Sequence, residues 1–110
     1  MPSGSPEPNP IACTLSSTEL RARLEWIARL NADALRGHHR NALQLELIYA
    51  SEAAERVREM VRHERHCCAF LNFSLHESRD FVAVTIEVPE SGREIAEVVF
   101  ESFLAGASTL

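Results

Sequence analysis

Alternation of apolar and polar side chains with a period of two residues predicts three β-strands in this chain. Leucine and tyrosine occupy every second position over residues 43–49, and apolar side chains do the same over residues 71–75 and 81–88. The short polar connection Glu77–Asp80 predicts a hairpin between the last two strands, and Pro89 is expected to end the last one. The three strands are therefore expected to form one small sheet.

A helical period of three to four residues precedes the first strand. Ser16 and Glu19 have the spacing of a capping box, so the helix is expected to begin with Ser16 as its N-cap. Gly37 is expected to end the helix in a left-handed conformation. The predicted buried stripe of this helix consists of Leu20, Leu24, Ile27, Leu30 or Asn31, and Leu35.

Two further helices are predicted by the same criteria. Ser51 is a natural N-cap for a helix that runs to about Cys67. Ser91 and Glu94 form a second capping box, which is expected to open a last helix that ends at Gly106.

The predicted order of elements is helix, strand, helix, strand, strand, helix. This order favours a two-layer α+β sandwich, with the helices on one face of a small, mainly antiparallel sheet. It resembles an incomplete ferredoxin-like fold that lacks its last strand, which is a likeness of topology alone. A single α+β domain is predicted over residues 11–106, and residues 1–10, rich in proline and serine, are predicted to be a disordered tail. Because a three-stranded sheet has two open edges, and the strand at residues 43–49 is long, a homodimer formed through a sheet edge is expected.

Charge and composition argue against some classes of partner. A formal net charge of −5 provides no cationic stripe for a phosphate backbone, so nucleic acid is not expected as a partner. The apolar stretches are too short to span a membrane and residues 1–10 lack the features of a secretion signal, so no membrane partner and a cytoplasmic location are expected. Three cysteines, two of them adjacent, make a poor disulfide framework and are expected to be thiols.

Unusual chemistry is concentrated in the segment His63–Phe73, at the end of the second predicted helix. On a helical wheel Glu64 and Cys68 fall within the apolar arc of this helix, with Cys67 at its edge. A carboxylate on an apolar face is costly unless it is paired or hydrogen-bonded. Glu64 is therefore expected either to have a function or to be compensated by an arginine or by backbone N–H groups of a neighbouring segment.

The cysteines admit a metal-binding and a packing interpretation. A three-sulfur site formed by Cys13, Cys67 and Cys68 would suit a soft ion such as Hg(II), Cu(I) or As(III). A zinc ion would need a fourth ligand, for which His63 or His66 is available, although the spacing matches no standard zinc signature. The alternative is a structural or protein-interaction domain with inert core thiols, because cysteine is often fully buried. A thiol-dependent enzyme is a third hypothesis, which is disfavoured because the dipole at a helix C-terminus opposes thiolate formation.

The chain also resembles a group of small uncharacterised bacterial proteins that share an E-R-x-C-C-x-F-L motif, present here over residues 64–71. The resemblance covers nearly the whole folded part, and it departs from the group at Ala69, where many of these proteins have proline, and at residues 91–93. Members of the group sometimes occur near genes for heavy-metal resistance, so the resemblance implies a metal-related function. The candidate functional residues that it implies are Glu64, Cys67, Cys68 and Cys13.

Overall fold

The computed structural model describes residues 17–107. In chain order its main elements are α1 (Ser17–Ala34), β1 (Leu35–Arg40), β2 (Gln44–Ala50), α2 (Ala54–Cys67), β3 (Asn72–Glu77), β4 (Phe81–Glu87) and α3 (Ala96–Phe103). Two short 3-10 helices, η1 (Ser51–Ala53) and η2 (Glu90–Ile95), lead into α2 and α3. None of the helices in residues 17–107 is long and apolar enough to cross a membrane. The predictions of a tail over residues 1–10 and of a cap at Ser16 lie outside the described residues.

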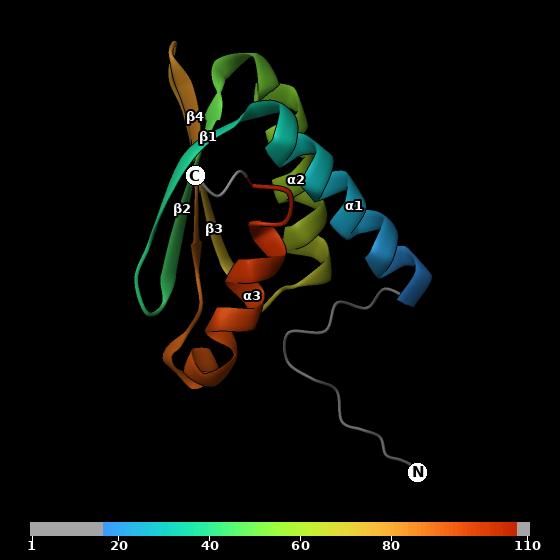
Figure 1. Ribbon diagram of the computed structural model, residues 1–110. Helices are drawn as coiled ribbons and strands as arrows, with labels where there is room; N and C mark the ends of the chain where they lie inside the picture. The colour runs from blue at the N-terminus through green and yellow to red at the C-terminus, as the bar shows by residue number, and fades with distance from the viewer. Residues whose placement is uncertain (1–16, 108–110) are drawn as a thin grey trace.

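The four strands form one antiparallel sheet in the order β1-β2-β4-β3. Figure 1 shows the three α-helices on one face of this sheet, so the predicted two-layer α+β sandwich is confirmed. The part from β2 to α3 is the strand, helix, strand, strand, helix unit expected from the sequence, with β4 between β2 and β3. β1 is an additional strand beside β2, in the position that the last strand takes in a complete ferredoxin-like sheet.

The first helix ends before its predicted cap, because the chain enters β1 directly after Ala34. Gly37 lies inside β1, next to an irregularity in the register between Leu35 and Gly37. It is not left-handed, since Gly106 is the glycine with a positive φ among the described residues. The sequence does not reveal β1 because its side chains are mostly exposed and do not alternate in polarity, so pairing with β2 defines the strand.

The additional strand changes which strands lie at the sheet edges. β2, which corresponds to the strand predicted at residues 43–49, is paired with β1 on one side and with β4 on the other. The prediction that this strand offers an open edge is therefore wrong. The edges of the sheet are β1 and β3.

The serine caps predicted for the second and third helices are not formed. Ser51 is the first residue of η1, whose N-cap is Ala50, and no side chain caps α2. Ser91 and Glu94 both lie inside η2, whose N-cap is Pro89. In both places a 3-10 turn tightens the entry into the helix, so the serine becomes part of that turn instead of preceding the helix.

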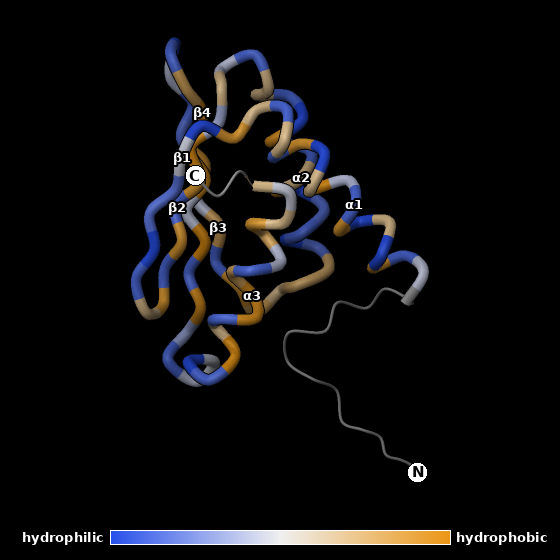
Figure 2. The backbone as a smooth tube through the Cα atoms, viewed as in Figure 1, coloured by the Kyte–Doolittle hydropathy of each residue, from blue (hydrophilic) through white to orange (hydrophobic). Residues whose placement is uncertain are grey.

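The core lies between the helices and the inner face of the sheet. Of the side chains predicted to face inward, those inside β2 and β4 are at most 1% exposed; they are Leu45, Leu47, Tyr49, Val82, Val84 and Ile86. In Figure 2 hydrophobic residues recur along β2 and β4, whereas β1 is mainly hydrophilic. Removal of this apolar surface from water is the main force that holds the two layers together.

One polar network lies inside the core and joins the end of α3 to α1 and β2. Nδ2 of Asn31 donates to the carbonyl oxygens of Phe103 at 2.8 Å and Ala105 at 2.7 Å. Oδ1 of the same amide accepts a hydrogen bond of 2.7 Å from the hydroxyl of Tyr49. Burial raises the pKa of the Tyr49 phenol well above its usual range. Both N–H groups and the oxygen of the amide are used, so this network fixes the fold.

The turn after α3 requires a glycine at position 106. Gly106 has a φ of 78°, and a Cβ atom added there would lie 2.3 Å from the carbonyl oxygen of Ala28 in α1. Only glycine allows both the left-handed backbone and this close approach of two main chains.

Candidate functional site

The apolar face of α2 brings Glu64 and Cys68 to the junction of the three helices. Val57, Val61 and Glu64 are buried at intervals of four and three residues, as the helical wheel predicts. Cys68 follows the last helical residue, and its backbone has left the helical conformation, with φ −123° and ψ 68°. The N–H of Cys68 donates to the carbonyl oxygen of Glu64 at 2.7 Å, which keeps the thiol on the side of the carboxylate.

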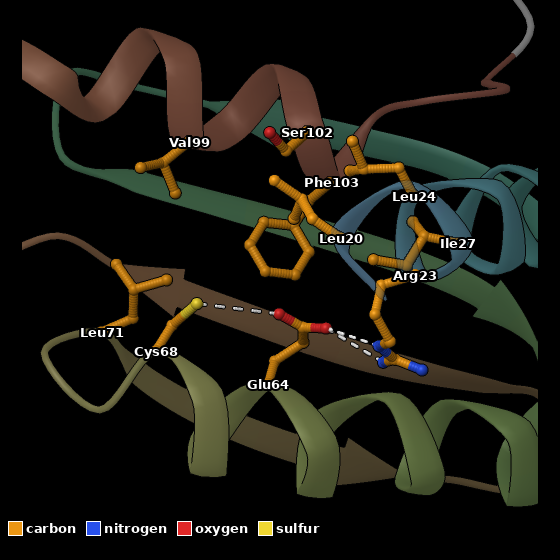
Figure 3. A pocket seen from close by; sticks show the side chains of 10 residues that line it. All are labelled: Leu20, Arg23, Leu24, Ile27, Glu64, Cys68, Leu71, Val99, Ser102 and Phe103. Carbon is orange, nitrogen blue, oxygen red and sulfur yellow. Dashed lines mark hydrogen bonds and ion pairs between the residues drawn. The ribbon is translucent and has the colours of Figure 1, made fainter. Parts of the chain in front are cut away.

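A cavity of about 70 Å³ lies between α1, α2 and α3 (Figure 3). Its walls are mainly apolar and consist of Leu20, Leu24, Ile27, Leu71, Val99 and Phe103, and its polar side chains are Arg23, Glu64, Cys68 and Ser102. Figure 3 shows the carboxylate of Glu64 between the thiol of Cys68 and the guanidinium of Arg23. Because one water takes about 30 Å³ of liquid and small-molecule pockets usually exceed about 300 Å³, the cavity suits one ion or two waters, not a metabolite.

Glu64 is held by an arginine from α1. Nη2 and Nε of Arg23 approach the same carboxylate oxygen, Oε2, at 2.9 Å and 3.3 Å. The side chains of Arg23 and Glu64 are 16% and 7% exposed, so the pair is largely shielded from water. The guanidinium also lies over the ring of Trp26, 5.2 Å from its centroid, in a cation–π contact. The structural compensation that the sequence suggests for Glu64 is therefore present.

The second carboxylate oxygen, Oε1, faces the thiol of Cys68. The distance from Sγ to Oε1 is 3.9 Å, which is long for a hydrogen bond even with a sulfur donor. Cys68 as a whole is 7% exposed. The two oxygens of Glu64 thus have unequal partners, because one accepts from a guanidinium at short distance and the other meets a weak donor beside the cavity.

The remaining motif side chains lie elsewhere. Cys67 is half-buried and packs against the core, but it does not line the cavity. His63 is exposed on α2, with its Nε2 atom 3.8 Å from a carboxylate oxygen of Glu59, and His66 is exposed as well. The structure therefore brings Cys68 and Glu64 together and separates both histidines from the cavity.

Within residues 17–107 no group of three or more histidine, cysteine, aspartate or glutamate side chains is arranged to hold a metal ion. The zinc ligand set predicted from the sequence combines the three cysteines with His63 or His66, and its members within residues 17–107 do not form such a group. The proposed three-sulfur set also includes Cys13, which lies outside the described residues.

Arg23 and Ser102 are site residues that the sequence pattern does not single out. Arg23 lies four residues before Ile27, on the apolar stripe of α1. It is a charged residue within that stripe, as Glu64 is within the apolar face of α2. A cationic residue on the apolar face of one helix and an anionic residue on that of another together indicate an ion pair between the two helices. Ser102 gives no such signal, because its hydroxyl donates to the carbonyl oxygen of Val98 at 3.2 Å, as serines within helices commonly do.

Comparison of the chain with models of protein families, with curated proteins and with solved structures found no significant match. The resemblance to bacterial proteins with the E-R-x-C-C-x-F-L motif stays a prediction.

Proposed function

We propose that the protein binds a single soft metal ion through its thiols, in the cavity beside Glu64. The observation that carries this proposal is the Cys68 thiol on a cavity of about 70 Å³, with a carboxylate oxygen 3.9 Å from the sulfur. Thiolate sulfur is the preferred ligand of ions such as Hg(II) and Cu(I). The protein would hold or buffer such an ion, and no chemical step is required.

The carboxylate of Glu64 is the group at the cavity that attracts a cation, and Arg23 balances part of its charge. Glu64 places negative charge beside the sulfur, and Arg23 fixes that carboxylate through contacts of 2.9 Å and 3.3 Å to Oε2. The apolar walls lower the local dielectric constant, so the attraction between the carboxylate and a bound cation is stronger than it would be in water. A thiol must lose its proton to bind a metal, and the affinity is therefore expected to rise with pH.

Further sulfur ligands in this proposal are Cys13 and Cys67, whose side chain does not line the cavity and would have to turn toward Cys68. Cys67 is adjacent to Cys68 at the end of α2, where the backbone leaves the helical conformation. Cys13 precedes the first residue of α1, Ser17, by four positions. The exposed histidines of α2 are not part of the proposed ligand set.

Titration of the reduced protein with Hg(II) or Cu(I) tests the proposal. One ion per chain is expected to bind, with sulfur-to-metal charge-transfer absorption and a higher melting temperature, because the ion binds the folded state. Cys13→Ser is expected to weaken binding, and the double variant Cys67→Ser, Cys68→Ser is expected to abolish it together with the effect on melting. Absence of stoichiometric binding, or equal binding by the double variant, would overturn the proposal.

A protein-interaction domain with inert thiols is the second candidate function. It is favoured by the burial of Cys68 within the hydrophobic core and by the sheet face opposite the helices, over which no element of residues 17–107 lies (Figure 1). A homodimer through one of the edge strands, β1 or β3, is the assembly expected in this case. It predicts a dimer by light scattering and thiols that do not react until the protein unfolds.

A cytoplasmic location belongs to the same metal-binding proposal, because reducing conditions there keep thiols available. The resemblance to proteins found near heavy-metal-resistance genes is consistent with it. A cell fraction that contains the protein outside the cytoplasm, with its cysteines oxidised, would contradict this part of the proposal.

A further inference from the structure

The sheet has two edge strands, β1 and β3, and they differ in whether their outward backbone groups have partners. In an antiparallel pair, alternate residues of a strand direct their N–H and C=O groups to the neighbouring strand. On an edge strand the residues between them direct these groups away from the sheet, where a further strand can pair with them.

In β3 one of the outward groups already has a partner from α2. The N–H of Ser78 donates to the carbonyl oxygen of Phe81 at 2.9 Å, so the even-numbered residues of β3 are bonded to β4 and the odd-numbered ones face outward. Nη2 of Arg65 donates to the carbonyl oxygen of Phe73, one of these odd-numbered residues, at 2.9 Å. A guanidinium group of α2 therefore lies at this edge and hinders pairing with a further strand.

In β1 the corresponding groups have no partner among residues 17–107. The N–H of Asn41 donates to the carbonyl oxygen of Gln44 at 2.9 Å, so the odd-numbered residues next to this turn are bonded to β2. The even-numbered residues His38 and Arg40 therefore direct their backbone groups outward. No hydrogen bond within the described part of the chain ends on these groups. β1 is thus an open edge to which an extended peptide can add one more strand.

The side chains of β1 indicate which kind of strand fits there. Four of its six residues are basic and none is acidic, although the whole chain has a formal net charge of −5. Arg40 pairs with Glu97 at 3.0 Å, whereas Arg36 and His38 are exposed and make no ion pair within residues 17–107. Positive charge, which protonation of the histidines increases, is therefore concentrated along the edge whose backbone groups are open.

A second copy of the chain is a poor occupant of this edge. Antiparallel pairing of β1 with itself through its outward groups places His38 of one copy opposite His38 or Arg40 of the other. Like charges directly opposite each other on two strands are destabilising. A strand that carries carboxylates has the opposite effect, because opposite charges across two strands attract each other.

We infer that β1 binds an extended acidic segment of another protein, which pairs with the backbone groups of His38 and Arg40 and places its carboxylates beside Arg36 and His38. The mode is addition of a strand to a sheet edge, in which the main chain supplies affinity and the side chains supply specificity. No residue of β1 lines the cavity beside Glu64, so this binding is independent of a metal ion and goes beyond the proposed function.

Titration of the whole protein with a fluorescent peptide tests the binding. The probe alternates glutamate and threonine over about ten residues, so that it spans the six residues of β1 with all its carboxylates on one face. A peptide that alternates lysine and threonine is the control. The acidic peptide is expected to bind once per chain, and more weakly at about 1 M salt, where charges are screened beyond about 3 Å. Absence of binding, or equal binding of the lysine peptide, would overturn the inference.

Charge reversal on β1 tests the part of the edge in this binding. The variant Arg36→Glu, His38→Glu is expected to weaken binding of the acidic peptide by at least about tenfold. Its matched control is Arg62→Glu, His66→Glu, which exchanges the same two residue types at exposed positions of α2. Equal weakening in the two variants would show that the net charge of the chain, and not β1, attracts the peptide.

Amide hydrogen exchange of the unsubstituted protein shows whether the main chains pair. With the acidic peptide at about ten times its dissociation constant, exchange of the amide protons of His38 and Arg40 is expected to slow about tenfold, because only free protein exchanges them. The amide of Leu75, an outward residue of β3, should exchange at an unchanged rate. Peptide binding that leaves His38 and Arg40 unprotected, or that protects Leu75 instead, would contradict pairing at β1. Protection of His38 and Arg40 without peptide, together with a dimer by light scattering, would show that a second copy occupies the edge and would likewise overturn the inference.

Discussion

Two polar side chains are buried in residues 17–107, Asn31 and Glu64, and their surroundings differ in one respect. The amide of Asn31 makes three hydrogen bonds of 2.7 to 2.8 Å, which use both its N–H groups and its oxygen. The carboxylate of Glu64 has two contacts with Arg23 on one oxygen, and on the other a contact of 3.9 Å with the Cys68 thiol beside a cavity. One group is fully used in holding the fold, and the other retains capacity to interact with a ligand.

This difference separates a structural network from a candidate site. A neutral amide whose hydrogen bonds are all short stabilises one arrangement of the helices. It has no hydrogen-bonding group left for a ligand. A buried ion pair contributes little net stability compared with apolar packing, so its presence next to a thiol and empty volume favours a role beyond packing. Substitution of the two groups is therefore expected to have different consequences.

The largest expected effect belongs to Asn31. Asn31→Ala removes three hydrogen bonds and leaves the Tyr49 hydroxyl and the carbonyl oxygens of Phe103 and Ala105 without their partner. We expect a loss of about 2 to 4 kcal/mol in the free energy of unfolding, measured with urea. Asn41→Ala is the control, because this exposed side chain only accepts from the N–H of Leu43, and should cost less than about 1 kcal/mol. Similar losses for the two variants would show that the network does not hold the fold.

The turn held by Asn31 gives the next largest effect. Gly106→Ala forces a side chain into a left-handed position and against the main chain of Ala28, and we expect a loss of about 2 to 3 kcal/mol. Gly37→Ala is a matched control, since a Cβ atom there meets nothing within 4 Å and the residue has no positive φ. It is expected to be neutral or to stabilise the protein by about 0.5 kcal/mol, because glycine is unfavourable in strands. A destabilising Gly37→Ala would show that the space beside Gly37 in β1 is not open.

Substitution of Glu64 is expected to lower the free energy of unfolding less than substitution of Asn31, and to weaken metal binding more. Glu64→Ala leaves the largely buried guanidinium of Arg23 without its carboxylate, so we expect a loss of about 1 to 3 kcal/mol. Glu59, whose side chain is 47% exposed and lies 3.8 Å from His63, is the control, and Glu59→Ala should stay within about 0.5 kcal/mol of the parent. Binding of Hg(II) should weaken in Glu64→Ala and not in Asn31→Ala. Loss of binding in both variants would remove the distinction between the two buried groups.

Titration of Tyr49 has no effect on stability near pH 7 and provides a test of the structural network at high pH. Burial raises the pKa of its phenol above the value of 10.0 of an unperturbed tyrosine, so the folded state keeps the proton when the unfolded state has lost it. The contribution of Tyr49 is complete below pH 10 and is lost at higher pH, by about 1.4 kcal/mol per pH unit. Tyr49→Phe should remove that part of the decline. Since this is the single tyrosine of the chain, its phenolate absorbance should appear only with unfolding; ionisation in the folded state would contradict its burial.

Periodicity in the sequence predicts those elements whose side chains face the core. The inner residues of β2 and β4 follow the period of two, and the apolar face of α2 follows the helical period, with Glu64 buried where the wheel places it. β1 is not predictable in this way, because its exposed basic side chains have no pattern and pairing with β2 alone defines it. The helix starts at Ser51 and Ser91 are mispredicted because a 3-10 turn and a serine cap use the same local sequence.

The candidate site is predictable only in part for a different reason. A carboxylate on an apolar face indicates that Glu64 has a partner, but the partner, Arg23, is 41 residues distant in the chain and is supplied by tertiary packing. Likewise, adjacent cysteines do not indicate that Cys68 lines a cavity and Cys67 does not, since this depends on where α2 ends. The exposed histidines His63 and His66 illustrate the reverse error, in which closeness in sequence suggests a shared site that the helix geometry separates.

The most direct test of the central claim, that Cys68 is an accessible thiol of a binding site, is the urea dependence of its labelling. In the variant Cys13→Ser, Cys67→Ser, the rate of reaction of Cys68 with methyl methanethiosulfonate is measured from zero urea to just below the unfolding transition. We expect a rate that is almost independent of urea, because only local opening is needed to expose Cys68. This rate should be at least about 100-fold above the rate in unfolded protein multiplied by the unfolded fraction. The opposite result is a labelling rate that equals the rate in unfolded protein multiplied by the unfolded fraction, and that rises with urea as steeply as global unfolding. It would identify Cys68 as an inert core thiol and contradict a binding site at Cys68.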